Sequence, residues 1–231
     1  MIQAMILAAG EGRRMQPLTL TRPKPLLAVA GKTLIEHQLD RLLAAGIEQC
    51  IINVAYLGEQ IEEALGDGSR HGLRITYSVE PQPLETGGAL NRALPLLDDA
   101  PFLLINADIW LDYPLRDLVC KAESVEDGHL VLVDNPNHNS RGDFVLADDG
   151  RVDAVQSDAQ LPSYTFSGLS LLHPRVIRDY PQRREIFPLR EIFAYSIARG
   201  GLSGEVYEGT WLDIGTPQRL QELEIHLQGM A

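Results

Sequence analysis

The chain has 231 residues, of which 45% are hydrophobic and 23% charged, a composition that fits a folded globular protein and excludes disorder and fibrous repeats. Its formal net charge of −12 argues against general binding to nucleic acid or to an anionic membrane, because such binding depends on neutralising phosphates. No apolar run is long enough to span a membrane. The apolar start at residues 1–10 has no basic region before it, so we expect a cytoplasmic protein with Cys50 and Cys120 as buried, reduced thiols.

Residues 1–110 alternate between strand-like and helix-like patterns. Short apolar runs, typical of buried parallel strands, occupy residues 2–9, 50–54 and 102–106, and residues 73–79 alternate in polarity as a further strand. Helical apolar stripes occupy residues 34–45, 57–65 and 87–97, the last of them limited by Pro95. This alternation predicts a doubly wound α/β sheet with right-handed crossovers.

Residues 111–231 carry shorter and less regular patterns. Strands are expected at residues 130–133, 144–146, 152–155 and 169–172, with loops at 134–143 and 156–163. Helices are expected at residues 185–198 and 218–228, the second beginning with Thr216 as N-cap and Pro217 at the first helical position. No repeat or linker separates the two halves, so we expect one domain spanning residues 1–231.

The loop after the first predicted strand, residues 8–15 (AAGEGRRM), is rich in small residues. Open α/β sheets bind ligands at this end of a strand, and backbone N–H groups there can hold a phosphate. The loop is not a Walker A motif, since no Gly-Lys-Ser/Thr follows, and Met15 replaces the third glycine of the dinucleotide fingerprint. A tight turn without a ligand remains an alternative.

Basic residues follow closely in this acidic chain. Arg13, Arg14 and Lys24 are near one another in sequence, and Lys24 lies between two prolines. The prolines stiffen the backbone, so the lysine side chain has a defined direction, as a polyphosphate site requires. A solvated basic turn is the alternative.

These residues resemble a known family signature. The run LAAGxGxRMxPLT at residues 7–19, followed by RPKPLL at residues 22–27, is similar to the signature of the sugar-1-phosphate nucleotidyltransferases. The resemblance implies a Rossmann-like fold, with a mixed, mostly parallel sheet flanked by helices and a sugar-binding subregion in the second half. The implied reaction joins a nucleoside triphosphate to a sugar 1-phosphate and releases pyrophosphate. The residues implied to hold the triphosphate are Ala8, Ala9, Gly10, Gly12, Arg14 and Lys24, with Lys24 stabilising charge at the α-phosphorus.

The segment at residues 80–88 (EPQPLETGG) could be a turn and a helix N-cap. The resemblance places the family's base-reading loop here and implies that Glu80, Thr86 and Gly87 contact the nucleotide. The form LETGG at residues 84–88 is similar to that of family members that use UTP and N-acetylmuramate 1-phosphate.

Two carboxylates are candidate ligands for Mg²⁺. Asp108 follows a buried strand, where it could instead cap the next element, and Asp213 lies between apolar residues in the run WLDIGTP at 211–217. The resemblance implies that both aspartates bind one Mg²⁺, that Asp108 is catalytic together with Arg14 and Lys24, and that Asn106 lies near the ribose or phosphates.

The sugar side is less defined. By order and spacing, Gly142, Ser167 and Gly168 match the family's two glycine-bearing strands around the sugar. Many members also have Glu-Lys-Pro between those strands, where this chain has QSD at residues 156–158, so the usual lysine contact is absent and only Asp158 is a candidate.

The resemblance therefore implies an Mg²⁺-dependent uridylyltransferase acting on N-acetylmuramate 1-phosphate in cell-wall recycling, with small-molecule substrates and neither nucleic acid nor membrane as partner. The oligomeric state is not indicated. Alternatives are a mannose 1-phosphate guanylyltransferase, a glucose 1-phosphate thymidylyltransferase, a phosphocholine cytidylyltransferase or a non-catalytic nucleotide-sugar sensor. The histidines show no metal-binding spacing, and no Ser-His pairing indicates a hydrolase.

Overall fold

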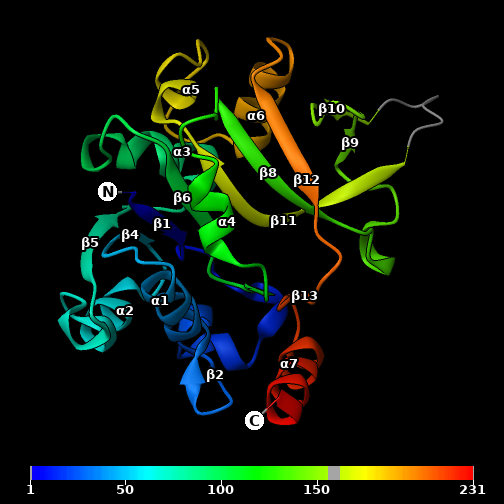
Figure 1. The fold of residues 1–231 in the computed structure, drawn as a ribbon. Coiled ribbons are helices and arrows are strands. Elements are labelled where there is room, and N and C mark those ends of the chain that lie inside the picture. The colour runs from blue at the N-terminus through cyan, green and yellow to red at the C-terminus, as the bar shows by residue number, and fades with distance from the viewer. Residues whose placement is uncertain (1, 156–161, 231) are drawn as a thin grey trace.

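The computed structural model describes residues 2–155 and 162–230. Its centre is a parallel arrangement in which β1 (Ala4–Leu7) lies between β6 (Phe102–Asn106) and β4 (Gln49–Val54), with β5 (Arg74–Val79) beyond β4 (Figure 1). The short apolar runs of the first half form these strands, which confirms the predicted α/β sheet.

Strands from the second half extend the same sheet. β11 (Ser163–Leu172) runs antiparallel to β6 and to β8 (Gly128–Val133), and β12 (Leu202–Val206) pairs with β8 in parallel. β9 (Phe144–Leu146) and β10 (Val152–Ala154) continue from β11. Within the described residues, nine strands thus form one mixed sheet that joins the two halves of the chain.

β11 is longer than the sequence pattern predicts. It begins at Ser163, where a loop was expected, and its register against β8 shifts between Phe166 and Ser170. Gly168 lies in this irregular stretch with φ of 86°, a conformation that glycine adopts without strain. The strand is ten residues long, and the irregularity divides its apolar pattern, which is why only its second part was predicted.

Helices cover both faces of the sheet. Along β1, Ala4 and Ile6 face one side and Met5 faces the other, as the period of two in a strand requires. The first side is covered by α1 (Leu34–Ala44), α2 (Gly58–Leu65) and α4 (Leu115–Cys120). The second side is covered by α3 (Glu85–Ala93), α5 (Pro174–Arg178) and α6 (Leu189–Ile197) (Figure 1).

Two short antiparallel strand pairs lie outside the main sheet. β2 (Ala28–Val29) pairs with β3 (Lys32–Thr33), and β7 (Ile109–Leu111) pairs with β13 (Trp211–Asp213). The C-terminal helix α7 (Pro217–Met230) packs beside β2 and β13 (Figure 1). As expected, α7 starts with proline, and the Thr216 hydroxyl accepts the Arg219 N–H at 3.4 Å.

Two further observations bear on the expectations from composition. In the described part of the chain, no helix combines the length and apolar character that crossing a membrane requires. Cys50 is a buried free thiol, but Cys120 is exposed, contrary to expectation, because it ends the short helix α4 on the solvent side.

Candidate active site

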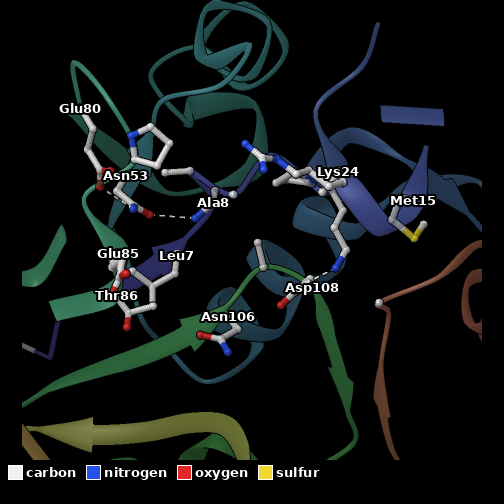
Figure 2. A pocket seen from close by; sticks show the side chains of 18 of the residues that line it. Leu7, Ala8, Met15, Lys24, Asn53, Glu80, Glu85, Thr86, Asn106 and Asp108 are labelled. Atoms are coloured by element: carbon white, nitrogen blue, oxygen red, sulfur yellow. Dashed lines mark hydrogen bonds and ion pairs between the residues drawn. The ribbon is translucent and has the colours of Figure 1, made fainter. Parts of the chain in front are cut away.

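A cleft of about 400 Å³ opens at the carboxyl ends of β1 and β6. It brings together ten of the residues singled out from the sequence: Ala8, Ala9, Gly10, Gly12, Arg14, Lys24, Glu80, Thr86, Asn106 and Asp108. Figure 2 shows the loop after β1 at the centre of this cleft, with Glu80 and Thr86 to one side of it and Lys24 and Asp108 to the other. The cleft therefore has distinct ends for the groups of one elongated ligand.

The backbone of the first loop has free hydrogen-bond donors. Within the described residues, the N–H groups of residues 9–13 meet no hydrogen-bond acceptor. Gly12 has φ of 62°, and a β-carbon there would lie 3.1 Å from the Lys24 β-carbon. The Thr19 hydroxyl donates to the Gly12 carbonyl at 2.8 Å and fixes the end of the loop. Successive free N–H groups on a fixed loop form a concave site for an anion.

Asn53, at the end of β4, connects two parts of the site and was not predicted. Its side-chain oxygen accepts the Ala8 N–H at 2.8 Å, and its amide donates to Glu80 at 2.7 Å (Figure 2). Glu80 also accepts the Leu84 N–H at 3.1 Å, and burial raises the pKa of its carboxyl. An asparagine inside the apolar run at 50–54 was the available signal, since a buried amide requires partners.

Lys24 forms an ion pair with Asp108, with 2.6 Å between the ammonium nitrogen and a carboxylate oxygen (Figure 2). Pro23 is extended, and Lys24 begins a 3₁₀ turn that orients its side chain into the cleft. The lysine is only 7% exposed, whereas the Asp108 side chain is 38% exposed. A buried cation and a more accessible carboxylate thus meet at one end of the cleft.

Asp213 does not line the cleft, but β-pairing places its backbone beside that of Asp108. β13 places Asp213 opposite Ile109 of β7, and the Ile214 N–H donates to the Asp108 carbonyl at 2.8 Å. The Asp213 carboxylate accepts from the Arg219 guanidinium at 2.7 Å and lies 3.5 Å from His138. The two aspartates that the sequence separates are therefore backbone neighbours in the fold.

The donor set at this point suits Mg²⁺. Residues 2–155 and 162–230 contain no cluster of three or more His, Cys, Asp or Glu side chains that could hold a metal, so the candidate ligands here are the two carboxylates of Asp108 and Asp213. Mg²⁺ is commonly bound by one or two carboxylates and completes its shell with water and substrate phosphates. Asp108 and Asp213, beside a loop suited to phosphate, fit that pattern.

Arg14 lies on the wall of the cleft against Gly215. A β-carbon at Gly215 would lie 3.1 Å from the Arg14 guanidinium, so the glycine leaves room for this group. Gly215 belongs to the run at residues 211–217, and its sequence position alone indicates no role. The structure shows that it adjoins the first loop.

The predicted base-reading segment is anchored to the start of α6. Residues 85–88 belong to α3, which begins at Glu85 and not at 87 as expected. The Thr86 hydroxyl accepts the Leu189 N–H at 2.9 Å. Gly87 is buried, donates its N–H to the Phe187 carbonyl at 2.9 Å, and leaves no room for a β-carbon against the Phe187 ring. Gly87 therefore lies behind the cleft wall that Thr86 lines.

A second cavity, of about 750 Å³, shares Glu85, Thr86 and Asn106 with the first. Gly142 lines it. A β-carbon at Gly168 would lie 2.7 Å from the Asn106 side-chain nitrogen, so Gly168 adjoins the boundary between the two cavities.

Two candidates for sugar binding remain, Ser167 and Asp158. Ser167 is fully buried, its hydroxyl accepts the Leu169 N–H at 3.2 Å, and its carbonyl accepts the Trp211 indole N–H at 2.9 Å. Asp158 lies outside the described residues.

Comparisons with known proteins identify the family of the chain. The family described as "Nucleotidyl transferase" matches residues 3–228. An N-acetylmuramate alpha-1-phosphate uridylyltransferase of Neisseria meningitidis serogroup B is 44% identical over 96% of this chain and 97% of its own length. A protein of the same name from Caulobacter vibrioides is 36% identical over 97% of this chain and 96% of its own.

Solved structures share the fold. A putative glucose-1-phosphate thymidylyltransferase from Bacillus anthracis, solved in complex with a sucrose, superposes with a TM-score of 0.84, covering 98% of this chain and 95% of its own, at 21% identity. The fold is thus that of a nucleotidyltransferase, and the chain is a member of the nucleotidyl transferase family. Within that family it is an enzyme of the sugar-1-phosphate type, and it resembles the N-acetylmuramate uridylyltransferases over nearly its full length.

Proposed function

We propose that this enzyme transfers UMP from UTP to N-acetylmuramate 1-phosphate, giving UDP-N-acetylmuramate and pyrophosphate. The observation that carries the proposal is that the free N–H groups of residues 9–13 lie in one cleft with Lys24 and Asp108. The names of two full-length relatives support the choice of base and sugar. Under this proposal, the enzyme acts in the cytoplasm, in the recycling of cell-wall amino sugar.

The reaction is an in-line displacement at the α-phosphorus. A phosphate oxygen of the sugar 1-phosphate forms a new bond to that phosphorus, and the bond to the bridging oxygen breaks, so that pyrophosphate leaves with the electron pair. Attacking and leaving groups are both acidic, so the barrier is repulsion between anions and their alignment. The N–H groups of residues 9–13 bind the triphosphate, and Arg14 and Lys24 stabilise the charge that develops during transfer.

Asp108 and Asp213 would hold Mg²⁺, and the family generally uses a divalent metal. The ion, when bound, supplies positive charge to the phosphates and helps to orient them. Arg219 and His138 contact the Asp213 carboxylate, while the N–H of the next residue, Ile214, donates to the Asp108 carbonyl. Accordingly, we propose these two aspartates as the metal ligands of the chain.

The base and sugar occupy the remaining parts of the cleft and the second cavity. Glu80, fixed by Asn53, and Thr86 lie at the base end, and the buried Gly87 holds that wall against Phe187. Asn106 lies at the boundary between the two cavities, where the ribose and phosphates would meet the sugar. On the sugar side, Gly142 lines the wall, while Ser167 and Gly168 shape it from behind.

The test is pyrophosphate release in the presence of Mg²⁺. UTP, dTTP, GTP and CTP would each be combined with the 1-phosphates of N-acetylmuramate, N-acetylglucosamine, glucose and mannose. We expect release chiefly from UTP with N-acetylmuramate 1-phosphate. Release chiefly from another pair would keep the nucleotidyltransferase class and overturn the proposed substrates. If the folded protein binds a triphosphate but no pair releases pyrophosphate, a non-catalytic sensor becomes the better account.

A further inference from the structure

Two arginines face the second cavity from different elements. Arg141 belongs to the loop between β8 and β9, and Arg190 is the second residue of α6. β10, which follows β9, packs against α6, so these elements meet around the cavity (Figure 1). Both side chains are exposed, and neither forms an ion pair or a side-chain hydrogen bond with the described residues.

The lack of an ion pair distinguishes Arg141 and Arg190 from most other arginines in residues 111–231. Six of them lie in ion pairs with carboxylates: Arg151, Arg175, Arg178, Arg184, Arg199 and Arg219. In a chain with net charge −12, two unpaired guanidinium groups on one cavity wall form a local site for an anion.

Acidic and polar side chains line the same cavity, but neither Asp143 nor Glu85 forms an ion pair with Arg141 or Arg190 in the described residues. The Asp143 carboxylate already accepts the Phe166 N–H at 2.9 Å and the Asn139 amide at 3.1 Å. The Thr86 hydroxyl is bonded to the start of α6. Glu85 lines both the nucleotide cleft and the second cavity, whereas Arg141 lines the second cavity alone.

The rest of the wall is apolar. Phe144 and Phe166 each meet Phe193 edge to face, at centroid distances of 5.9 and 5.4 Å, and all three line the cavity. An apolar wall beside a cationic pair fits a ligand that carries methyl groups next to a carboxylate.

We propose that Arg141 and Arg190 bind the carboxylate of the lactyl group that distinguishes N-acetylmuramate from N-acetylglucosamine. This inference rests on the proposed function and goes beyond it, because it assigns the choice of sugar to two residues. The methyl carbons of the lactyl and acetyl groups pack on the phenylalanine cluster. The two arginines thereby take over a role in sugar binding in a chain that lacks the Glu-Lys-Pro triplet.

The experiment compares three acceptors with UTP: N-acetylmuramate 1-phosphate, its lactyl carboxamide, and N-acetylglucosamine 1-phosphate. The first two differ only in the charge of the lactyl group. We expect the wild type to prefer the acid over the amide in kcat/KM by ~10-fold or more, the scale of a charged hydrogen bond. Arg141→Gln and Arg190→Gln should each lower this ratio, and the double variant should bring it near one.

Arg116→Gln is the matched control, since Arg116 is an exposed arginine on α4 that lines neither cavity. It should keep the wild-type ratio of acid to amide. The proposal is overturned if the arginine variants, verified as folded by circular dichroism, keep that ratio too, or if they slow acid and amide equally. A wild type that does not use N-acetylmuramate 1-phosphate would overturn the proposed function and, with it, this inference.

Discussion

The ammonium nitrogen of Lys24 lies 2.6 Å from a carboxylate oxygen of Asp108, which links the turn after the first loop to the end of β6. These two residues are 84 positions apart in sequence. The ion pair orients a buried cation toward the carboxylate that we propose as a metal ligand. The ammonium group that stabilises charge at the α-phosphate in the proposed mechanism is therefore held in place before substrate arrives, as preorganised electrostatic catalysis requires.

Replacing Lys24 tests this arrangement. We expect Lys24→Ala to lower kcat by ~100-fold or more, the scale of losing one preorganised charge-stabilising group. Pyrophosphate release at saturating substrates measures the effect. Lys32→Ala is the control, because Lys32 forms an exposed ion pair with Asp40 at 2.5 Å, away from the cleft, and that variant should keep its turnover. Near-wild-type turnover in folded Lys24→Ala would remove the lysine from the mechanism.

Replacing Asp108 or Asp213 should change the Mg²⁺ concentration that the enzyme requires, whereas replacing an acidic residue elsewhere should not. We expect Asp108→Asn to lower turnover by ~100-fold or more, and both Asp108→Asn and Asp213→Asn to raise the Mg²⁺ concentration needed for half-maximal rate. An independent readout is the thermal shift that Mg²⁺ produces in the presence of UTP, which both variants should reduce. Asp149→Asn, on an exposed loop, should behave like the wild type. An unchanged Mg²⁺ dependence in both site variants would contradict the assignment.

The sequence was sufficient for those parts of the fold and site that depend on local patterns. The segments that form β1, β4 and β6 are mainly apolar, β5 alternates in polarity, and the first loop follows directly from β1. Since parallel strands end at one edge of a sheet, the placement of Glu80 and Asn106 near that loop follows from the strand order.

Features that depend on tertiary contacts could not be predicted. β7 and β13 have three residues each and pair across about half the chain, so no local pattern marks them. From the sequence, Gly87 was expected to contact the nucleotide, but it is buried because Phe187 packs against it. Ser167 is likewise buried by a strand irregularity that no residue pattern reveals.

Replacing Asn53 tests how far the first loop depends on the hydrogen bonds that this side chain makes with Ala8 and Glu80. Removing its side chain leaves the Ala8 N–H without its partner and Glu80 without one of its donors. We expect Asn53→Ala to lower the free energy of unfolding by about 1–3 kcal/mol, the cost of unsatisfied buried polar groups, and to raise KM for the triphosphate. Urea unfolding and initial rates measure the two effects. Asn137→Ala, at an exposed position, should change neither, and equal values for the two variants would refute the supporting role.

The start of α6 carries a carboxylate whose ionisation should be visible in the pH dependence of stability. Glu191 accepts two hydrogen bonds from Arg184, at 2.7 and 2.8 Å, and one from the Tyr180 hydroxyl at 2.7 Å. Arg184 and, after it, Tyr180 lower the pKa of Glu191 from 4.5 to about 2. Because the folded state has the lower pKa, the stabilisation is present above about pH 4.5 and is lost as the pH falls toward 2.

Glu191→Gln should therefore be less stable than the wild type at pH 7, and the difference in the free energy of unfolding should shrink as the pH is lowered from 5 to 3. Denaturant unfolding at a series of pH values measures it. Glu222→Gln, an exposed position on α7, gives the baseline, because its difference from the wild type should stay small at every pH. A Glu191→Gln penalty that is the same at pH 7 and pH 3 would mean that the lowered pKa makes no contribution to folding.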